Sequence, residues 1–178
     1  MKKIILAFIL FAFIGCKEEK KEEKKEEKKV EIPTFNVSFN LILQKDDKIH
    51  LYYTQDGTVN FNEDNSSWLD LKGSSTPQTI TFKLPQDVFP TNLRVDFGSG
   101  VNELQSDVDL KSFTMEYAGK KVLAEGNKIF EFFYINESNT KRLEGTTILK
   151  KLDKKQAVGP MLYPHALLTE KAKELVKK

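Results

Sequence analysis

The sequence predicts a mainly β protein: an antiparallel β-sandwich of about seven to nine short strands, followed by a helix at the C-terminus. From residue 32 onward, apolar and polar residues alternate in short runs, which is the period of a strand with one buried face. Gly, Pro and Asp-Gly pairs interrupt these runs at short intervals. Residues 32–178 fit one domain in length. The choice between a jelly-roll and an immunoglobulin-like topology stays open.

The first two predicted strands are residues 34–43 and 48–54. The first places Phe35, Val37, Phe39 and two leucines on one face, and polar residues on most of the other. The second places Ile49, Leu51 and Tyr53 opposite His50 and Tyr52. Because only a short polar segment separates the two runs, we expect them to form a hairpin.

The middle of the chain predicts further short strands at residues 68–72, 79–84, 92–97 and 108–117, with 121–124 pairing back on the last of these. In 92–97 the alternation turns Arg94 and Asp96 outward, where we expect an exposed ion pair of small energetic value.

The last part of the domain contains two more predicted strands and the helix. Residues 127–135 are apolar on both faces, which is typical of a central strand covered on both sides. Residues 143–149 complete the strands. From residue 166 the apolar residues have helical spacing, and lysines crowd the last turn, so a helix over about 166–178 is expected to lie across an open end or edge of the sheets. His165 is interpreted as a helix-entry residue.

The N-terminus indicates where the protein is delivered. Lys2 and Lys3 precede an apolar run of eleven residues, 4–14, which is too short for the roughly 20 residues that span a bilayer and fits a secretory signal. Gly15 and Cys16 follow, and Cys16 is the only cysteine. Residues 13–16 resemble the lipobox of bacterial lipoproteins. The resemblance implies a signal peptide over residues 1–15, cleavage before Cys16, and attachment of the protein to a membrane through acyl chains on Cys16.

Residues 16–31 consist of Cys16 and a tract of alternating lysine and glutamate pairs. Because this spacing puts like charges four residues apart, we interpret the tract as a tether rather than a helix. Lys17-Glu18-Glu19 resembles the surface-export signal of Bacteroidetes lipoproteins, which implies a lipid-anchored protein on the outer face of the outer membrane. The alternatives are a plain spacer and the periplasmic face.

The charge balance argues against nucleic acid as a partner. The chain has 28 basic and 26 acidic residues, and loss of Lys2 and Lys3 with the signal peptide would make the two numbers equal. Proteins that bind nucleic acid need a basic excess to displace counterions from phosphates.

Residues 52–61, 79–85 and 93–98, within a segment of about 48–117, are similar to a β-rich segment of Bacteroidetes lipoproteins and membrane proteins that handle surface sugar polymers. The resemblance implies a compact sandwich in a surface-glycan context. It carries no functional residue to this chain.

Two ligand sites can be proposed from residue types. Tyr52, Trp68 and His50 would form a platform for a sugar ring, since aromatic faces pack on the apolar faces of carbohydrates, although a single Trp in a strand is more often core. Asp56 lies close by in sequence and joins Tyr52 and Trp68 as a candidate ligand residue. Residues 60–64 are rich in oxygen ligands, but Asn65 and Leu71 stand where an EF-hand has Gly and Glu, so a solvated loop is favoured over a calcium site.

The sequence does not indicate an enzyme. It has two histidines and lacks the common zinc, serine-hydrolase and phosphate-loop motifs. We therefore expect no catalytic residue, metal or cofactor, and a non-catalytic binding or accessory module, with glycan as a candidate ligand. A structural or assembly lipoprotein of an envelope complex is the alternative, and a glycan hydrolase is third.

Overall fold

The computed structural model describes residues 32–98 and 104–177. The predicted signal peptide, Cys16 and the charged tether lie outside the described residues. All statements below therefore concern the domain that begins at Ile32.

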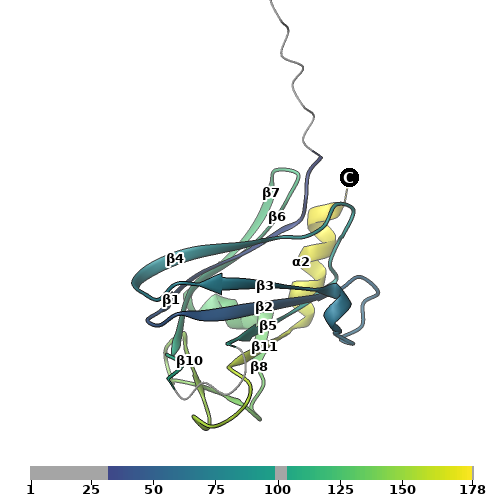
Figure 1. The fold of residues 1–178 in the computed structure, drawn as a ribbon. Helices are drawn as coiled ribbons and strands as arrows, with labels where there is room; N and C mark the ends of the chain where they lie inside the picture. Colours follow the sequence, from purple (N-terminus) through teal and green to yellow (C-terminus); the bar gives the residue numbers. More distant parts are fainter. Residues whose placement is uncertain (1–31, 99–103, 178) are drawn as a thin grey trace, which may run out of the picture. The chain divides into compact units, whose positions relative to one another are not determined.

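Two antiparallel sheets pack face to face, as the sequence predicts (Figure 1). Sheet A has the order β4 (Ser74–Lys83), β1 (Asn36–Leu43), β6 (Val108–Tyr117), β10 (Ile148–Lys151) and β9 (Thr140–Arg142), and β7 (Lys120–Glu125) also pairs with β6. Sheet B has the order β3 (Ser66–Leu71), β2 (Asp47–Thr54), β5 (Asn92–Phe97), β11 (Met161–Pro164) and β8 (Phe133–Ile135). The described residues thus form eleven strands, against the seven to nine expected.

The core lies between the sheets and is rich in phenylalanine. The inward positions of β1 are fully buried, and the ring of Phe39 lies 5.3 Å from that of Phe113 in sheet A and 6.4 Å from that of Phe97 in sheet B. Each such side chain contributes about 1.5–3 kcal/mol by leaving water. The alternation read from the sequence therefore identifies the core-facing residues correctly in β1 and β5.

The expected hairpin between the first two strands is wrong, because β1 and β2 belong to different sheets. The segment between them passes from one sheet to the other beside the β3–β4 connection. Asp46 accepts hydrogen bonds from the Gly73 N–H at 2.9 Å and from Lys72 Nζ at 2.6 Å. A Cβ on Gly73 would lie 2.6 Å from the Gln44 carbonyl oxygen, so the close approach of the two connections requires glycine.

The expected central strand at 127–135 is also wrong. This segment forms a 3₁₀ turn at Gly126–Lys128, the short helix α1 (Ile129–Phe132) and then β8, which lies at an edge of sheet B. Ile129, Phe132 and Phe133 are buried, and their i, i+3, i+4 spacing is helical. Apolar residues at both odd and even positions fit a covered strand and a buried helical turn equally well, so the pattern could not decide between them.

The expected strand at 143–149 is wrong over most of its length. Residues 143–147 form the turn between β9, which ends at Arg142, and β10, which begins at Ile148, and Gly145 in this turn has φ +70°. The short strand β11 was not predicted, because Met161, Leu162 and Tyr163 give too short a run to show alternation.

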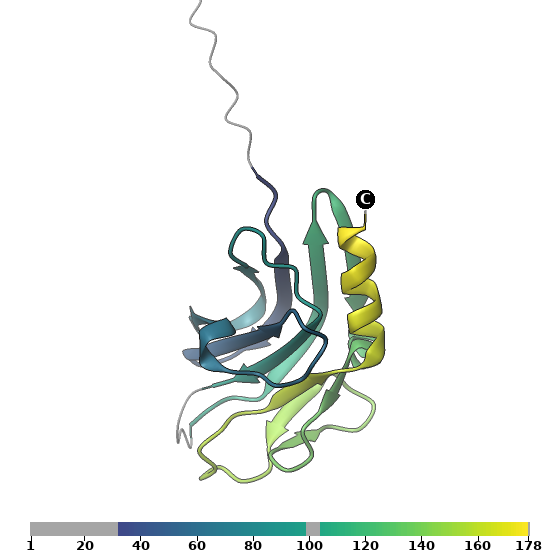
Figure 2. The same cartoon turned by 90° about the vertical axis from the view of Figure 1, so that its right-hand side faces the viewer.

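The C-terminal helix α2 (Ala166–Val176) confirms the prediction of a helix from residue 166. It contacts β5 and β11 of sheet B and β6 and β7 of sheet A, and Figure 2 shows it in yellow along one side of the sandwich. Leu168, Ala172 and Leu175 face inward, and Thr169 Oγ1 donates to Asn92 Oδ1 at 2.6 Å. Within residues 32–98 and 104–177, no helix has the length and apolar character needed to cross a membrane.

Candidate functional site

The outer face of sheet B carries two rows of side chains that cross the strands. In the first row, His50 is paired with Trp68 on one side and Asp96 on the other, and Met161 is paired with Asp96. The second row consists of Tyr52, Arg94, Tyr163 and Tyr134. We call these eight residues the aromatic face. Successive strands lie about 4.8 Å apart, so the face extends roughly 19 Å from β3 to β8.

The centre of the aromatic face is a covered ion pair. Arg94 donates from Nε to Asp96 Oδ1 at 2.8 Å and from its NH2 group to Asp96 Oδ2 at 2.5 Å. The guanidinium carbon lies 4.8 Å from the centre of the Tyr52 ring and 5.2 Å from that of Tyr163, so the cation rests between two aromatic faces. Only 19% of the Arg94 side chain and 10% of the Asp96 side chain are exposed. The expectation of an exposed pair is therefore wrong.

Burial raises the pKa of Asp96, because the loss of water outweighs the hydrogen bonds and the positive charge that Arg94 provides. Charged groups on an outer sheet face normally stay in water at no cost. Holding them in a nearly dry setting is unfavourable unless the geometry is good, and a bidentate pair between two rings meets that condition.

His50 occupies the middle of the first row and is 1% exposed. Its ring centre lies 3.8 Å from that of Trp68, with the planes 22° apart, and 3.8 Å from that of Tyr52. Its Nε2 is buried and has no hydrogen-bond partner among the described residues; Glu63 Oε2 lies 3.6 Å away. Burial lowers the pKa of His50, Glu63 opposes this, and Arg94 adds to it, so the ring is neutral at pH 7.

Glu63 reaches the face from a 3₁₀ turn (Glu63–Asn65) between β2 and β3. Its Oε1 accepts a 2.6 Å hydrogen bond from the Tyr52 hydroxyl. Burial raises the pKa of Tyr52, and this hydrogen bond raises it further. In the same loop Phe61 contacts the rings of Tyr52 and Tyr163. The loop over residues 61–65 therefore helps to cover the row of tyrosines.

The first cavity of the face, which we call the His50 cavity, has a volume of about 300 Å³. Trp68 and residues 157–159 line it, together with His50, Arg94 and Asp96. The 157–159 segment lies close to β5, because the Phe97 N–H donates to the Pro160 carbonyl at 2.9 Å. A Cβ on Gly159 would lie 1.3 Å from the Phe97 carbonyl oxygen, so only glycine fits there.

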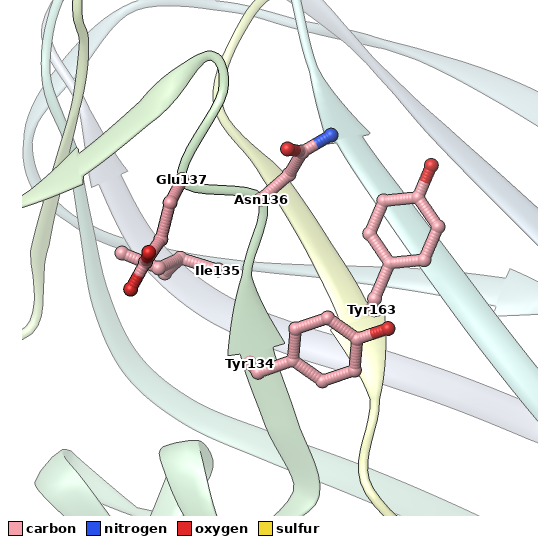
Figure 3. Close-up of a pocket in the computed structure, with 5 residues that line it drawn as sticks. All are labelled: Tyr134, Ile135, Asn136, Glu137 and Tyr163. Carbon is pink, nitrogen blue, oxygen red and sulfur yellow. The ribbon is translucent and has the colours of Figure 1, made fainter.

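The second cavity, which we call the Tyr134 cavity, lies at the β8 end of the face and has a volume of about 460 Å³. Tyr134, Tyr163, Asn136 and Glu137 line it, together with Ile135 (Figure 3). The rings of Tyr134 and Tyr163 are stacked at 5.8 Å, and in Figure 3 they lie beside each other on neighbouring strands. The cavity thus combines two aromatic rings with an amide and a carboxylate.

The sequence-based platform is partly realised. The structure brings Tyr52, Trp68 and His50 together, but Tyr52 is 8% exposed and His50 is covered, so Trp68, at 44%, provides the exposed ring. The expectation that a single Trp is core is wrong here, since Trp68 lies on the edge strand of sheet B.

Asp56 is not part of the face. Its Oδ1 accepts hydrogen bonds from the N–H and the hydroxyl of Thr58, both at 2.9 Å, and the backbone bond is the main reason that its pKa is lowered. The carboxylate closes its own turn after β2. Asp56 lines neither the His50 cavity nor the Tyr134 cavity, so the structure does not join it to Tyr52 and Trp68.

Two side chains of the oxygen-rich loop, Asn62 and Glu63, already accept hydrogen bonds from nearby residues. Asn62 Oδ1 accepts from the Asn65 N–H at 3.2 Å and caps the 3₁₀ turn, while Glu63 is bonded to Tyr52. Among residues 32–98 and 104–177, no three His, Cys, Asp or Glu side chains are grouped as a metal site would need.

Sequence reasoning missed Tyr134, Tyr163 and Met161. Tyr134 was placed on one face of the wrongly predicted central strand, and the other two lie on the short strand that was not predicted. The tyrosines could have been found only from the pairing of β8 with β11, which places Tyr163 opposite Tyr134.

The arrangement suits binding more than proton transfer. Trp68 and Tyr134, each 44% exposed, stand at the two ends of the aromatic face, and each borders a cavity with hydrogen-bonding groups. The Asp96 carboxylate in the His50 cavity already accepts two hydrogen bonds from Arg94. No protein-family model, curated protein or solved structure matches the chain.

Proposed function

We propose that this protein is a membrane-anchored lipoprotein whose β-sandwich is a non-catalytic binding module for glycan, with the aromatic face as its binding surface. The observation that carries the proposal is the pair of half-exposed rings, Trp68 and Tyr134, each next to a cavity on a face otherwise covered. A soluble domain gains nothing in stability from exposing such rings beside polar cavities, whereas a ligand site needs both.

A sugar fits this surface better than a purely apolar ligand. Sugar rings offer an apolar face for Trp68 or Tyr134 and hydroxyl groups at their edges for polar partners. Asn136 and Glu137 in one cavity, and His50 in the other, offer such partners. The equal numbers of basic and acidic residues after signal cleavage fit a ligand that does not depend on strong charge attraction.

The anchor in this proposal is Cys16, with residues 16–31 as a tether and the outer membrane as the site, either on the cell surface or on the periplasmic face. Acyl chains contribute about 0.8 kcal/mol per buried methylene, so two or three chains would hold the domain firmly at a membrane. The support for this part is the resemblance of residues 13–19 to lipoprotein signals.

The assembly alternative predicts an apolar patch on the C-terminal helix. Every residue of α2 is described, and none of its large apolar side chains is exposed, because Leu168 and Leu175 are buried and Leu167 and Val176 pack against the core. The hydrolase alternative predicts two free carboxylates facing one cleft. Asp96 is paired with Arg94, and Glu63 is bonded to Tyr52, which supports a binding role.

Glycan binding can be tested by affinity electrophoresis of the purified protein against a panel of neutral and acidic polysaccharides. Trp68→Ala and Tyr134→Ala should each weaken binding about tenfold, since loss of one ring stack is worth about 1.4 kcal/mol. Phe89→Ala is the matched control, because Phe89 is an exposed aromatic residue in the β4–β5 connection and packs on Tyr117. Equal losses in all three variants, or no binding by the native protein, would overturn the proposal.

The anchor needs a separate test in cells. Protease accessibility on intact cells should show digestion of the native protein, loss of membrane attachment in Cys16→Ala, and protection when Lys17, Glu18 and Glu19 are replaced by alanine. A native protein that stays membrane-bound but protected would place it on the periplasmic face.

A further inference from the structure

His50 lines the His50 cavity and carries a ring nitrogen that lacks a hydrogen bond. Its Nε2 is buried and has no partner among the described residues. A buried nitrogen without a hydrogen-bond partner is destabilising, because it has lost its bonds to water and gained none in the protein. The fold therefore holds an unfavourable group at this cavity, and a ligand that bonds to Nε2 would remove the cost.

The surroundings of Nε2 restrict what that ligand can be. A carboxylate oxygen, Glu63 Oε2, lies 3.6 Å from Nε2, and the side chain of Glu63 is 73% exposed. Asp96 adds a second negative charge, and Arg94, the cation of this cluster, already gives two hydrogen bonds to Asp96. The three groups together are therefore negative, and the faces of the surrounding aromatic rings are negative as well.

A hydroxyl group matches this setting in every respect. It can donate to or accept from an imidazole nitrogen, so it satisfies Nε2 in either neutral tautomer, and it can also donate to Glu63 Oε2. A carboxylate or sulfate brought to the same place would find no free cation in this cluster and would face Glu63.

The size of the cavity agrees with a single ring. About 300 Å³ is at the small end of ligand sites. Ala157, Val158 and Gly159, which also line the cavity, are small or medium-sized residues. Trp68 stacks on His50, is 44% exposed and borders the same cavity, so a sugar ring in the cavity contacts its indole.

We infer that the His50 cavity takes one ring of an uncharged saccharide, whose hydroxyl group bonds to His50 Nε2, and that Glu63 and Asp96 select against acidic saccharides. This inference rests on the proposed function and adds the class of sugar and the side of the face where it is recognised.

The test is isothermal titration calorimetry of the purified full-length mature chain with oligosaccharides from neutral polymers (dextran, galactomannan, β-glucan) and from acidic ones (polygalacturonate, alginate). Neutral oligosaccharides should bind at least tenfold more tightly than acidic ones. His50→Phe keeps a ring of similar shape but removes Nε2, and it should weaken neutral binding about fivefold or more.

Glu63→Gln keeps an oxygen for the Tyr52 hydroxyl and removes the charge. It should raise the ratio of acidic to neutral affinity about fivefold, which corresponds to about 1 kcal/mol for one charge at 4 Å in water. Asp70→Asn is the matched control: Asp70 is an exposed carboxylate on β3 that pairs with Lys48 outside the cavity, and its removal should leave the ratio unchanged.

The possible results distinguish the inference about uncharged saccharides from the proposed function of glycan binding. If saccharides bind through Trp68 or Tyr134 but acidic ones bind as well as neutral ones, or if His50→Phe and Glu63→Gln change nothing, the inference is wrong and the proposed function survives. If no saccharide binds the native protein, both fail. Should His50→Phe not fold, the Glu63→Gln ratio alone decides.

Discussion

The outer faces of the two sheets differ in what covers them. On sheet A, short polar side chains of β1 and β4 bond across the strands in the open: Ser38 to Thr81, and Asn40 to Thr79, both at 2.8 Å. On sheet B the outward side chains are large, and His50, Tyr52, Asp96 and Met161 are each less than 9% exposed. Polar side chains of sheet A therefore face water, whereas the charged pair of sheet B is covered by large aromatic neighbours.

Each face has an ion pair between residues two apart on one strand, which makes the comparison quantitative. On β6, Lys111 and Asp109 have side chains that are 40% and 24% exposed. On β5, Arg94 and Asp96 are 19% and 10% exposed and lie among rings. Replacement of a buried ion pair by apolar residues is often neutral or stabilising, so stability alone does not explain why sheet B has a covered pair.

The largest expected effect on stability follows from removing the aspartate of each ion pair. Asp96→Ala leaves the Arg94 guanidinium buried without its partner and should lower the free energy of unfolding by about 3–5 kcal/mol. Asp109→Ala, on the more exposed pair, should cost about 1 kcal/mol or less. Urea unfolding of both variants measures the difference. Similar losses would mean that the two faces are energetically alike.

Removal of a hydroxyl group should give a smaller contrast. Tyr52→Phe deletes the 2.6 Å hydrogen bond to Glu63 and should cost about 1.5–3 kcal/mol, because one partner is charged. Ser38→Ala deletes an exposed bond to Thr81 and should cost about 0.5 kcal/mol. The same unfolding measurement applies, and a larger cost for Ser38→Ala would reverse the comparison.

The pH dependence of stability should also depend on the covered face. The pKa of His50 in the folded protein lies below its ordinary value of 6.5, because burial and the charge of Arg94 outweigh the charge of Glu63. The pKa of the neighbouring Asp96 is raised, because burial outweighs the effect of Arg94. At His50 the unfolded chain therefore takes up the proton first. The contribution of neutral His50 is complete above pH 6.5 and is lost as the pH falls below that value.

The melting temperature should accordingly decrease from pH 7 to pH 5 more steeply in the native protein than in His50→Gln, which has no titrating ring. A His165→Gln variant controls for the second histidine. Parallel curves for the native protein and His50→Gln would show that the ring is not held neutral.

The smallest change in stability is expected from replacing both members of the covered pair. Arg94→Met with Asp96→Leu exchanges two charges for apolar groups of similar reach, and such replacements are often neutral or stabilising. Stability should stay within about 1 kcal/mol of the native value or rise. If the pair serves the ligand site, saccharide binding should nevertheless weaken. Loss of stability with unchanged binding would assign the pair to folding alone.

Local pattern predicted the strands best where one face meets the core and the other meets water. The bounds of β5 and β6 were predicted as observed, and the inward residues of β1 were all identified. The pattern failed where apolar residues occupy both faces of the expected strand. Ile129 and Phe132 fall on opposite faces of that strand, yet both are buried in α1, because period alone does not separate a covered strand from a buried turn.

The candidate site was predicted only where its residues lie on strands that are consecutive in the sequence. Tyr52, Trp68 and His50 were chosen from residue type and proved to be neighbours, since β2 and β3 are consecutive strands and pair directly. Asp56 was chosen from sequence proximity and is used by its own turn. Tyr134 and Tyr163 come from strands far along the chain.

The sequence alone determined which side of each alternating strand faces the core, and that the chain ends in a helix, because both depend on the spacing of apolar residues within one short segment. The tertiary structure decided which strands share a sheet, as the wrong hairpin of β1 and β2 shows. It also decided that Arg94, Asp96 and His50 are covered. Whether an outward side chain meets water depends on segments brought over it from elsewhere, here the loop that contains Phe61 and the residues around Gly159, and local sequence carries no record of that contact.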